Sequence, residues 1–355
     1  MLLNFLLLFT LSTTSLAAVK FNFEKLTQQN DVVWGFDFLA DGRIIFSERK
    51  GVLKVFDPKS KSVTEIKGTP KVWSKGQGGL LDIRVHTKSQ KIFMTYAEPI
   101  GEKATTALAS ATLSGNELKD FKKLFSAQES NSNESHFGSR IEFDDKGHVF
   151  ITVGDRDERP HVQDLAFTTG KIIRLNEDGS VPKDNPFVKN KTAKPEIWSL
   201  GHRSPQGLVR NPMTGDLWEA EMGPRGGDEI NLIKPGANYG WPVITHGREY
   251  SGLPIGPNSK EGMEQPVVYW APSISPSGMT IYNGNAFPEW KGNIFLGNLS
   301  GAHLRRITLD GKKVTGQEEL LKDKGYRIRN VRPGPEGFLY LSTDDGIIAR
   351  LVPAN

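Results

Sequence analysis

A strand–turn–strand pattern recurs six times along this chain, and it constrains the possible fold more than any other feature. Each copy has an alternating apolar strand, a turn that usually contains glycine with aspartate or proline, and a strongly apolar second strand. The copies span residues 33–46, 81–94, 139–151, 207–218, 278–296 and 331–341. One hairpin cannot bury both of its faces, whereas six hairpins stacked radially bury every inner face.

The spacing of the copies predicts a six-bladed β-propeller built from four-stranded antiparallel blades. A chain of 355 residues leaves roughly 40–75 residues for each unit, which suits a four-stranded blade with loops of variable length. Further strands are expected at Gly51–Phe56 and Gly346–Leu351, and a strand around Val19–Phe23 is expected to close the ring beside the last blade. We expect one propeller over residues 18–355; a pair of β-sandwiches is the structural alternative.

Residues 1–17 differ from the rest of the chain. Residues 2–11 are apolar except for Asn4 and Thr10, and a small-residue site at 15–17 follows. The pattern predicts a secretory signal peptide, because the apolar segment is too short to span a membrane. We therefore expect export to the periplasm or the medium without stable membrane insertion; a buried start to the domain is the alternative. The chain has no cysteine, which excludes disulfides and a lipid-anchored cysteine.

The basic residues are scattered along the chain. Lysine and arginine number 45 against 41 acidic residues, with a net charge of +4 and no run of five or more basic residues. This distribution argues against a nucleic-acid partner. The sequence also has no phosphate-binding loop, dinucleotide fingerprint, EF-hand or zinc-binding cluster of histidine and cysteine.

Four polar loops precede equivalent strands of their blades, so radial symmetry brings them together at one mouth of the central channel. They span residues 76–79, 134–138, 201–207 and 326–330. The loops are the most promising place for function, because binding chemistry concentrates in loops on a rigid scaffold. Together they predict one pocket that holds Gln77, His136, Arg203, Gln206, Arg327 and Arg329, with Asp155 reaching toward it.

His136 is the candidate general base of this pocket, because an imidazole exchanges its proton near neutral pH. A loop histidine bonded to backbone is the alternative. Arg327 and Arg329 alternate on a strand, so both face the same way and can bind carboxylate or phosphate oxygens; salt bridges on an exposed strand are the alternative. Trp270 is expected either to line the substrate side or to pack in the core.

The loop Met222–Asp228 is a candidate cation site. Its glycines leave the backbone carbonyls uncrowded, and Asp228 supplies a carboxylate at its end. Carbonyl and carboxylate oxygens are the ligands that a hard cation such as Ca²⁺ takes.

Several motifs occur in the same order as in one known family. They are residues 76–82, the His136 loop, Gly154-Asp155, residues 201–208 and 223–231, the segment Asn238-Tyr-Gly-Trp-Pro242, and the pair Arg327 and Arg329. Over roughly residues 30–352 the chain resembles the soluble glucose/sorbosone dehydrogenase family, and especially its bacterial aldose sugar dehydrogenases. The combination of motifs is specific, although no single motif is.

The resemblance implies a six-bladed propeller that uses pyrroloquinoline quinone (PQQ) and Ca²⁺ to oxidise aldose sugars to lactones, with electrons passed to an unidentified acceptor. It implies that His136 takes the hydroxyl proton while hydride leaves the anomeric carbon for the quinone, and that Arg203 stabilises the charge on the quinone. The remaining implied roles are sugar contact or orientation of His136 for Gln77 and Asp155, cofactor binding for Gln206, Arg327 and Arg329, and Ca²⁺ binding by the carbonyls of Gly223 and Pro224 with support from Asp228.

Three serines depart from the family's pattern. Ser135 stands where the family's glucose dehydrogenases have an aspartate before the histidine, which bears on how His136 is oriented. Ser300 stands where a lysine holds the cofactor, and Ser204 stands where an asparagine follows the arginine. We keep Ser204 and Ser300 as cofactor-binding positions, with weaker cofactor binding expected without the lysine.

Two functions from other classes stay open. One is a Ca²⁺-dependent lactonase-type propeller, which needs several carboxylates converging on one metal at the channel mouth. The other is a non-catalytic propeller that binds a glycan or a protein partner.

Overall fold

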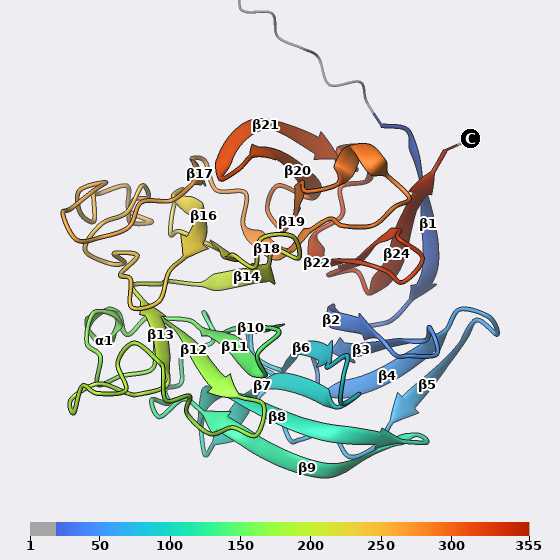
Figure 1. Ribbon diagram of the computed structural model, residues 1–355, viewed down its shortest axis with the longest axis horizontal. Coiled ribbons are helices and arrows are strands. Elements are labelled where there is room, and N and C mark those ends of the chain that lie inside the picture. The colour runs from blue at the N-terminus through green and yellow to red at the C-terminus, as the bar shows by residue number, and fades with distance from the viewer. Residues whose placement is uncertain (1–18, 355) are drawn as a thin grey trace, which may run out of the picture.

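Six four-stranded antiparallel sheets surround a central axis in the computed structural model, which describes residues 19–354 (Figure 1). The innermost strands of the six sheets form a closed ring: each packs against the inner strand of the next sheet, and the sixth packs against the first. The sheets therefore form the six blades of a β-propeller, as the repeat predicted.

Within each blade the strands follow one another from the axis outward in chain order, except that β1 is the outermost strand of blade 6. Blade 1 has β2 (Val33–Phe38), β3 (Ile44–Glu48), β4 (Val52–Asp57) and β5 (Ser62–Ile66). Blade 2 has β6 (Leu80–Val85), β7 (Ile92–Ile100), β8 (Lys103–Ser114) and β9 (Glu117–Ser126). Blade 3 has β10 (Gly138–Phe143), β11 (His148–Val153), β12 (Lys171–Asn176) and β13 (Ile197–Leu200).

The second half of the ring repeats this arrangement. Blade 4 has β14 (Pro205–Arg210), β15 (Leu217–Glu221), β16 (Asp228–Ile233) and β17 (Val268–Trp270). Blade 5 has β18 (Pro276–Ile281), β19 (Ile294–Asn298), β20 (His303–Asp310) and β21 (Lys313–Leu320). Blade 6 has β22 (Ile328–Pro333), β23 (Leu339–Thr343), β24 (Ile347–Pro353) and β1 (Phe21–Gln28). Helical turns are short: α1 (Arg159–Val162), η1 (Pro288–Trp290) and η2 (Lys322–Lys324).

The N-terminal strand closes the ring, and it is longer than predicted. β1 pairs antiparallel with β24, from Phe21 opposite Pro353 to Gln28 opposite Ile347. The register shifts between Lys25 and Thr27, and this bulge interrupts the alternation by which the sequence marks a strand. The signal peptide predicted for residues 1–17 lies outside the described residues. Within residues 19–354, no helix is long and apolar enough to cross a membrane.

The core lies between the blades, because each interface between successive blades has its own apolar cluster. Between blades 1 and 2, for example, Ile45 and Leu53 pack with Ile83 and Met94. The other five interfaces are filled in the same way. Stacking therefore buries both faces of the sheets, which supplies the hydrophobic stabilisation of a fold without disulfides.

Arg140 lies on β10, the inner strand of blade 3, and contacts the inner strands of the five other blades. Its guanidinium donates to main-chain oxygens of β14 and β22 at 2.6 and 2.7 Å and lies 3.4 Å from a serine hydroxyl of β18. It also lies 3.4 Å from a carboxylate of β6 and 4.0 Å from the ring centroid of a tryptophan of β2. These partners are, in order, Gln206, Arg329, Ser277, Asp82 and Trp34. Since only a group at the axis can reach all six inner strands, Arg140 marks the centre of the propeller.

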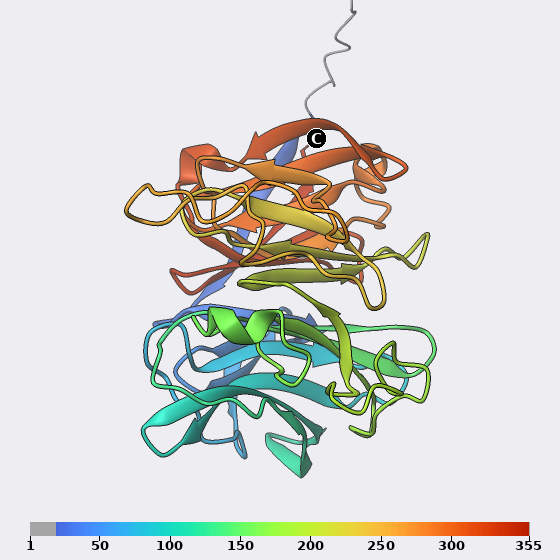
Figure 2. The same ribbon diagram turned by 90° about the vertical axis from the view of Figure 1, so that its left-hand side faces the viewer.

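Two loop excursions lie on the same side of the ring, facing the viewer in Figure 2. One spans residues 154–170 and contains α1, and the other spans residues 234–267 between β16 and β17. Arg159 forms an ion pair with Glu249 at 2.5 Å, and Gln163 donates to the carbonyl of Trp241 at 2.7 Å. These contacts join the two excursions beside the mouth of the channel.

Candidate active site

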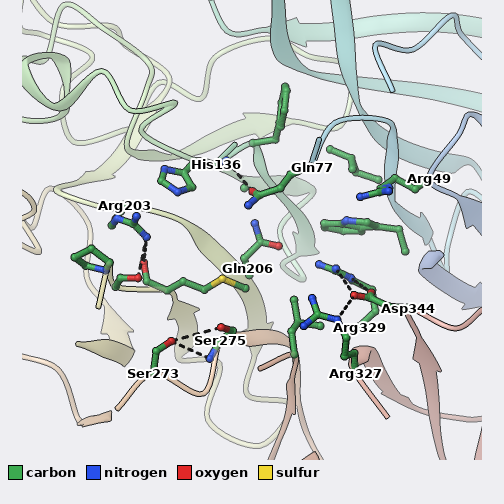
Figure 3. A pocket seen from close by; sticks show the side chains of 18 of the residues that line it. Arg49, Gln77, His136, Arg203, Gln206, Ser273, Ser275, Arg327, Arg329 and Asp344 are labelled. Atoms are coloured by element: carbon green, nitrogen blue, oxygen red, sulfur yellow. Dashed lines mark hydrogen bonds and ion pairs between the residues drawn. The ribbon is translucent and has the colours of Figure 1, made fainter. Parts of the chain in front are cut away.

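A cavity of about 340 Å³ lies at the mouth that the predicted loops surround (Figure 3). Each of the six blades contributes side chains to its lining. They include Trp34 and Arg49 from blade 1, Gln77 from blade 2, His136 from blade 3, Arg203 and Gln206 from blade 4, Ser273 and Ser275 before blade 5, and Arg327, Arg329 and Asp344 from blade 6. The structure thus brings together the six residues whose loop positions predicted a shared pocket.

His136 is fixed through its backbone and through one ring nitrogen. Its main-chain φ is +55°, and its N–H donates to Oε1 of Gln77 at 2.8 Å. Its Nδ1 lies 2.7 Å from Oδ1 of Asp155 and 3.3 Å from Oδ1 of Asp157. Gly154 permits this approach, because a Cβ there would lie 2.0 Å from the His136 carbonyl oxygen. With a proton on Nδ1 held by Asp155, the lone pair of Nε2 is available to a ligand in the cavity.

The loop before His136 is held by an arginine. Arg156 donates to the carbonyls of Ser135 and Asn133, the second at 2.5 Å, and its guanidinium carbon lies 3.6 Å from the ring centroid of Phe137. Burial lowers the pKa of Arg156 to about 10, although nearby carboxylates oppose this shift. The side chain of Arg156 therefore orders the backbone on which His136 is carried.

Asp155 is fully buried behind His136. Its carboxylate accepts hydrogen bonds from Nδ1 of His136, from Nε1 of Trp241 at 2.7 Å, and from the backbone N–H of Asp157 at 2.9 Å. Burial raises the pKa of Asp155, but the hydrogen bond and charge of His136 and the charge of Arg203 outweigh burial, so the pKa is lowered. Asp155 is thus an ionised acceptor that orients the imidazole.

Arg203 lies on the opposite side of the cavity from the arginines of blade 6 (Figure 3). Its Nη1 donates to the carbonyls of Met222 and Gly223 at 3.0 and 2.9 Å, and its main-chain N–H donates to Glu221. Its Nε is buried without a partner among the residues that the structure describes, as is Oε1 of Gln206. Two cavity residues therefore have polar atoms that a polar ligand could satisfy.

Arg327 and Arg329 share a single carboxylate. Arg329 binds Asp344 through Nε at 2.7 Å and Nη2 at 3.0 Å, and Arg327 binds it through Nε at 2.9 Å. Burial raises the pKa of Asp344, but the two guanidinium groups outweigh burial and lower it. Arg49 donates to the carbonyl of Gly76 at 2.7 Å, and no carboxylate pairs with it within residues 19–354. The lining of the cavity is therefore strongly positive.

The loop after β15 forms part of the cavity wall. Gly223 and Pro224 line it, and a Cβ on Gly223 would lie 2.2 Å from the carbonyl oxygen of Gly226, so only glycine fits there. Asp228 accepts hydrogen bonds from the N–H of Gly223 at 3.0 Å and from Ser273 and its two successors at 2.7–2.8 Å. Burial raises the pKa of Asp228, although these donors oppose it. Asp228 thus connects the loop at Gly223 to the segment 273–275.

Five of the predicted site residues lie outside the cavity lining: Asp155 and Asp228, described above, and Ser204, Ser300 and Trp270. Ser204 is buried at the start of β14, and its carbonyl accepts from the N–H of Met222 at 3.1 Å. Ser300 lines an adjoining depression, where its Oγ lies 2.8 Å from that of Ser275. Trp270 ends the outermost strand of blade 4, and its indole donates to Gln317 of blade 5 at 2.9 Å. The structure therefore does not bring Trp270 to the cavity, because its side chain faces the neighbouring blade.

Four further lining residues were not predicted from the sequence because they lie outside the four polar loops: Trp34, Arg49, Tyr250 and Asp344. Arg49 and Asp344 each follow the second strand of a blade directly, and this shared position is the signal that could have identified them.

A second polar group, also missed from the sequence, lies beside Arg203. This group consists of three buried residues, His202, Glu219 and Glu221. Each has one atom that could bind a metal ion, and these three atoms lie within 4.8 Å of one another. Burial, together with the charge of Glu221, raises the pKa of Glu219 well above its usual range. Oxygen donors of this kind can hold a cation.

Comparison with known proteins gives consistent matches over the full ring. Residues 30–350 match the family described as Glucose / Sorbosone dehydrogenase. The aldose sugar dehydrogenase YliI of Escherichia coli (strain K12) is 41% identical over 348 residues, which cover 94% of this chain and 93% of that protein. The apo-form crystal structure of the soluble aldose sugar dehydrogenase from E. coli has a TM-score of 0.90 at 39% identity, covering 94% of this chain and 100% of that one. The PQQ-bound aldose sugar dehydrogenase from Streptomyces coelicolor has a TM-score of 0.78 at 25% identity, covering 94% and 99%.

Proposed function

This chain belongs to the glucose/sorbosone dehydrogenase family, and from that premise we propose that it oxidises aldose sugars at the anomeric carbon to lactones with PQQ and Ca²⁺. A PQQ-bound relative supports the choice of cofactor. The observation in this chain that carries the proposal is the composition of the cavity. An imidazole whose Nδ1 is held by a buried carboxylate shares the cavity with four arginines and one lining carboxylate, Asp344.

The cavity residues fit the quinone. PQQ carries three carboxylates, and the planar fork of an arginine binds a carboxylate through two parallel hydrogen bonds. Arg49, Arg327 and Arg329 line one side of the cavity, where Asp344 neutralises only one positive charge. The unpartnered Nε of Arg203 and Oε1 of Gln206 add a donor and an acceptor. These residues would hold the cofactor.

The loop at Gly223 and Pro224 fits a hard cation. Its carbonyl oxygens are the ligand type that Ca²⁺ takes, and its backbone is packed too closely for a side chain at Gly223 or Gly227. The carbonyl of Gly223 accepts a hydrogen bond from Arg203 in this structure. The loop would therefore hold Ca²⁺ through its backbone, with Asp228 fixing the N–H of Gly223.

The reaction removes a proton and a hydride from the sugar. His136 accepts the proton of the anomeric hydroxyl at Nε2, and the negative charge of Asp155 stabilises the imidazolium that forms. When bound, PQQ supplies the two-electron acceptor for the hydride that leaves the anomeric carbon. Arg203 stabilises the negative charge that develops at that acceptor. The sugar leaves as a lactone, and an external electron acceptor completes the cycle.

The cavity favours this chemistry over the alternative hydrolase. A Ca²⁺-dependent lactonase-type site needs several carboxylates converging on one metal. Asp344 is the one carboxylate in the lining drawn from residues 19–354, and it is already paired with Arg327 and Arg329. A non-catalytic propeller would tolerate replacement of the cavity residues, and this is what the following experiment tests.

The test is reconstitution of the purified apoprotein with PQQ and Ca²⁺. We expect a change in cofactor absorbance on binding and dye reduction that depends on an aldose from a panel of sugars. His136→Gln is expected to leave cofactor binding nearly intact and to abolish turnover. The matched control is His148→Gln, because His148 forms an equivalent 2.7 Å pair with Asp144 at the other end of blade 3. Absence of sugar-dependent reduction by the wild-type protein contradicts the proposal. Full turnover by His136→Gln would show that His136 has a structural role and is not the general base.

We also propose that the protein is exported. The support is the N-terminal sequence, in which an apolar segment precedes a small-residue site at residues 15–17. Cell fractionation followed by N-terminal sequencing tests it, and a protein found only in the cytoplasm with residues 1–17 retained contradicts it.

A further inference from the structure

We propose that Trp241 is a positioning residue for the reaction proposed above: its indole N–H fixes the carboxylate of Asp155, which in turn fixes the ring of His136. The proposal rests on the proposed function for its catalytic meaning, and on geometry alone for the arrangement. Trp241 belongs to the segment Asn238-Tyr-Gly-Trp-Pro242, none of whose residues lines the cavity.

The carboxylate of Asp155 is held at both oxygens by different donors. Oδ2 accepts from Nε1 of Trp241 at 2.7 Å, and Oδ1 accepts from Nδ1 of His136 at 2.7 Å. The backbone N–H of Asp157 also donates to Oδ1, at 2.9 Å. Donors at opposite oxygens prevent the carboxylate from rotating about its bond to Cβ. The plane of the carboxylate sets the plane of the imidazole, because the hydrogen bond between them is directional.

Trp241 is itself rigidly placed. It is 4% exposed, and its main-chain N–H donates to the carbonyl of Gly201 at 3.0 Å. The turn before it requires glycine, because Gly240 has φ +92° and a Cβ there would lie 2.1 Å from Cγ1 of Ile244. The carbonyl of Trp241 accepts from Gln163, in the excursion beside it (Figure 2). The indole is therefore carried on a backbone that cannot shift without breaking these contacts.

The indole also contacts the cationic side of the site. The guanidinium carbon of Arg203 lies 5.5 Å from its ring centroid, and that of Arg159 lies 5.0 Å away. One side chain thus contacts both the carboxylate behind His136 and the guanidinium of Arg203. Asp155, held in place by Trp241, therefore orients His136 without an aspartate at position 135.

Removing the indole N–H of Trp241 leaves the negative charge on the carboxylate of Asp155 less neutralised. The charged groups around Asp155 are Asp157, Arg156, Arg159 and Arg203, and none of them changes in a Trp241→Phe variant. Without the indole donor, the negative charge of Asp155 is less neutralised, and it stabilises the protonated form of the adjacent imidazole. The unprotonated base then forms only at higher pH. The carboxylate is also free to rotate, which misplaces the base.

The test compares Trp241→Phe with Trp218→Phe. Trp218 is buried in blade 4, and its indole N–H has no partner among residues 19–354, so this control removes the same ring without removing a hydrogen bond. In the apoprotein, the His136 ring resonances, assigned by their loss in His136→Gln, are followed by NMR against pH. We expect their titration midpoint to move to higher pH in Trp241→Phe and to stay in place in Trp218→Phe.

The reconstituted enzyme gives an independent readout. We expect Trp241→Phe to lower kcat about ten- to a hundredfold, because a hydrogen bond to a charged group is lost, with the acid limb of the kcat profile moved to higher pH and KM for the sugar little changed. Asp155→Asn, which keeps the shape of the side chain, serves as second variant and is expected to lower kcat at least as much. Titration midpoints that coincide for wild type and Trp241→Phe overturn the proposal. If the wild-type enzyme oxidises no aldose, the proposed function fails, while the NMR comparison still decides the positioning role.

Discussion

Replacing Arg140 with methionine is expected to destabilise the propeller strongly, because it removes a side chain that contacts the inner strands of the five other blades. Its two short hydrogen bonds go to the carbonyls of Gln206 and Arg329 at 2.6 and 2.7 Å. A hydrogen bond from a charged donor is worth about 1.5–3 kcal/mol, so the two together stabilise the fold by about 3–6 kcal/mol. Asp82 keeps Arg332 at 3.4 Å and the backbone N–H of Ile141 at 3.0 Å, so it is not left without partners.

This free energy converts into a measurable change in the melting temperature. The entropy of unfolding is about 2.1 cal/mol/K per residue, or about 0.7 kcal/mol/K for a chain of this length. We therefore expect the midpoint of Arg140→Met to fall by about 4–9 °C, measured on the apoprotein by calorimetry or tryptophan fluorescence. Arg43→Met is the control, because the pair of Arg43 and Asp41 is exposed, with side chains 40% and 53% accessible. Such pairs contribute less than about 1 kcal/mol. A midpoint for Arg140→Met that matches that of Arg43→Met would contradict a stabilising role for Arg140.

Two further predictions concern the charges of the cavity. Ser300→Lys places a cation in the depression beside Pro224, and we expect the Kd for PQQ, measured by absorbance titration, to fall severalfold and the gain to shrink at high salt; an unchanged Kd contradicts this. The pKa of Asp344 is lowered below the ordinary 3.8 by Arg327 and Arg329, so its contribution to stability is present above pH 4 and is lost as the pH falls through the lowered pKa. The melting temperature of wild type should therefore exceed that of Asp344→Asn at about pH 6, and the difference should shrink as the pH falls below about 4; a constant difference would count against the ion pairs.

The ring could be predicted from the sequence because its inner hairpins carry their signal locally. β10 and β11, for instance, follow from the alternation in residues 139–151 and the turn between them. The extent of β1 could not be predicted, because the bulge after Lys25 breaks the alternation and its partner lies at the far end of the chain.

The site was predictable only where radial symmetry applies. Gln77, His136 and Arg203 precede inner strands, so their meeting followed from the fold. Asp344 lines the cavity from a different position in its blade, directly after the second strand. By itself an aspartate there resembles a turn former, and only its correspondence with Arg49 of blade 1 sets it apart. For Trp270 the sequence left open the substrate side and the core, because an aromatic residue beside Pro272 does not reveal which way its side chain faces; in the structure it packs against the apolar cluster between blades 4 and 5.

The ring is closed by the pairing of β1 with β24, where Phe21 lies opposite Pro353. The first and the last of the described strands therefore pair, and the ring cannot close until β24 has left the ribosome. Pairing across so long a loop carries a large entropic cost and is slow. During synthesis, β1 and the exposed edge of the last blade must both stay unpaired, and these two edges are where an incomplete chain is most open to association with other copies.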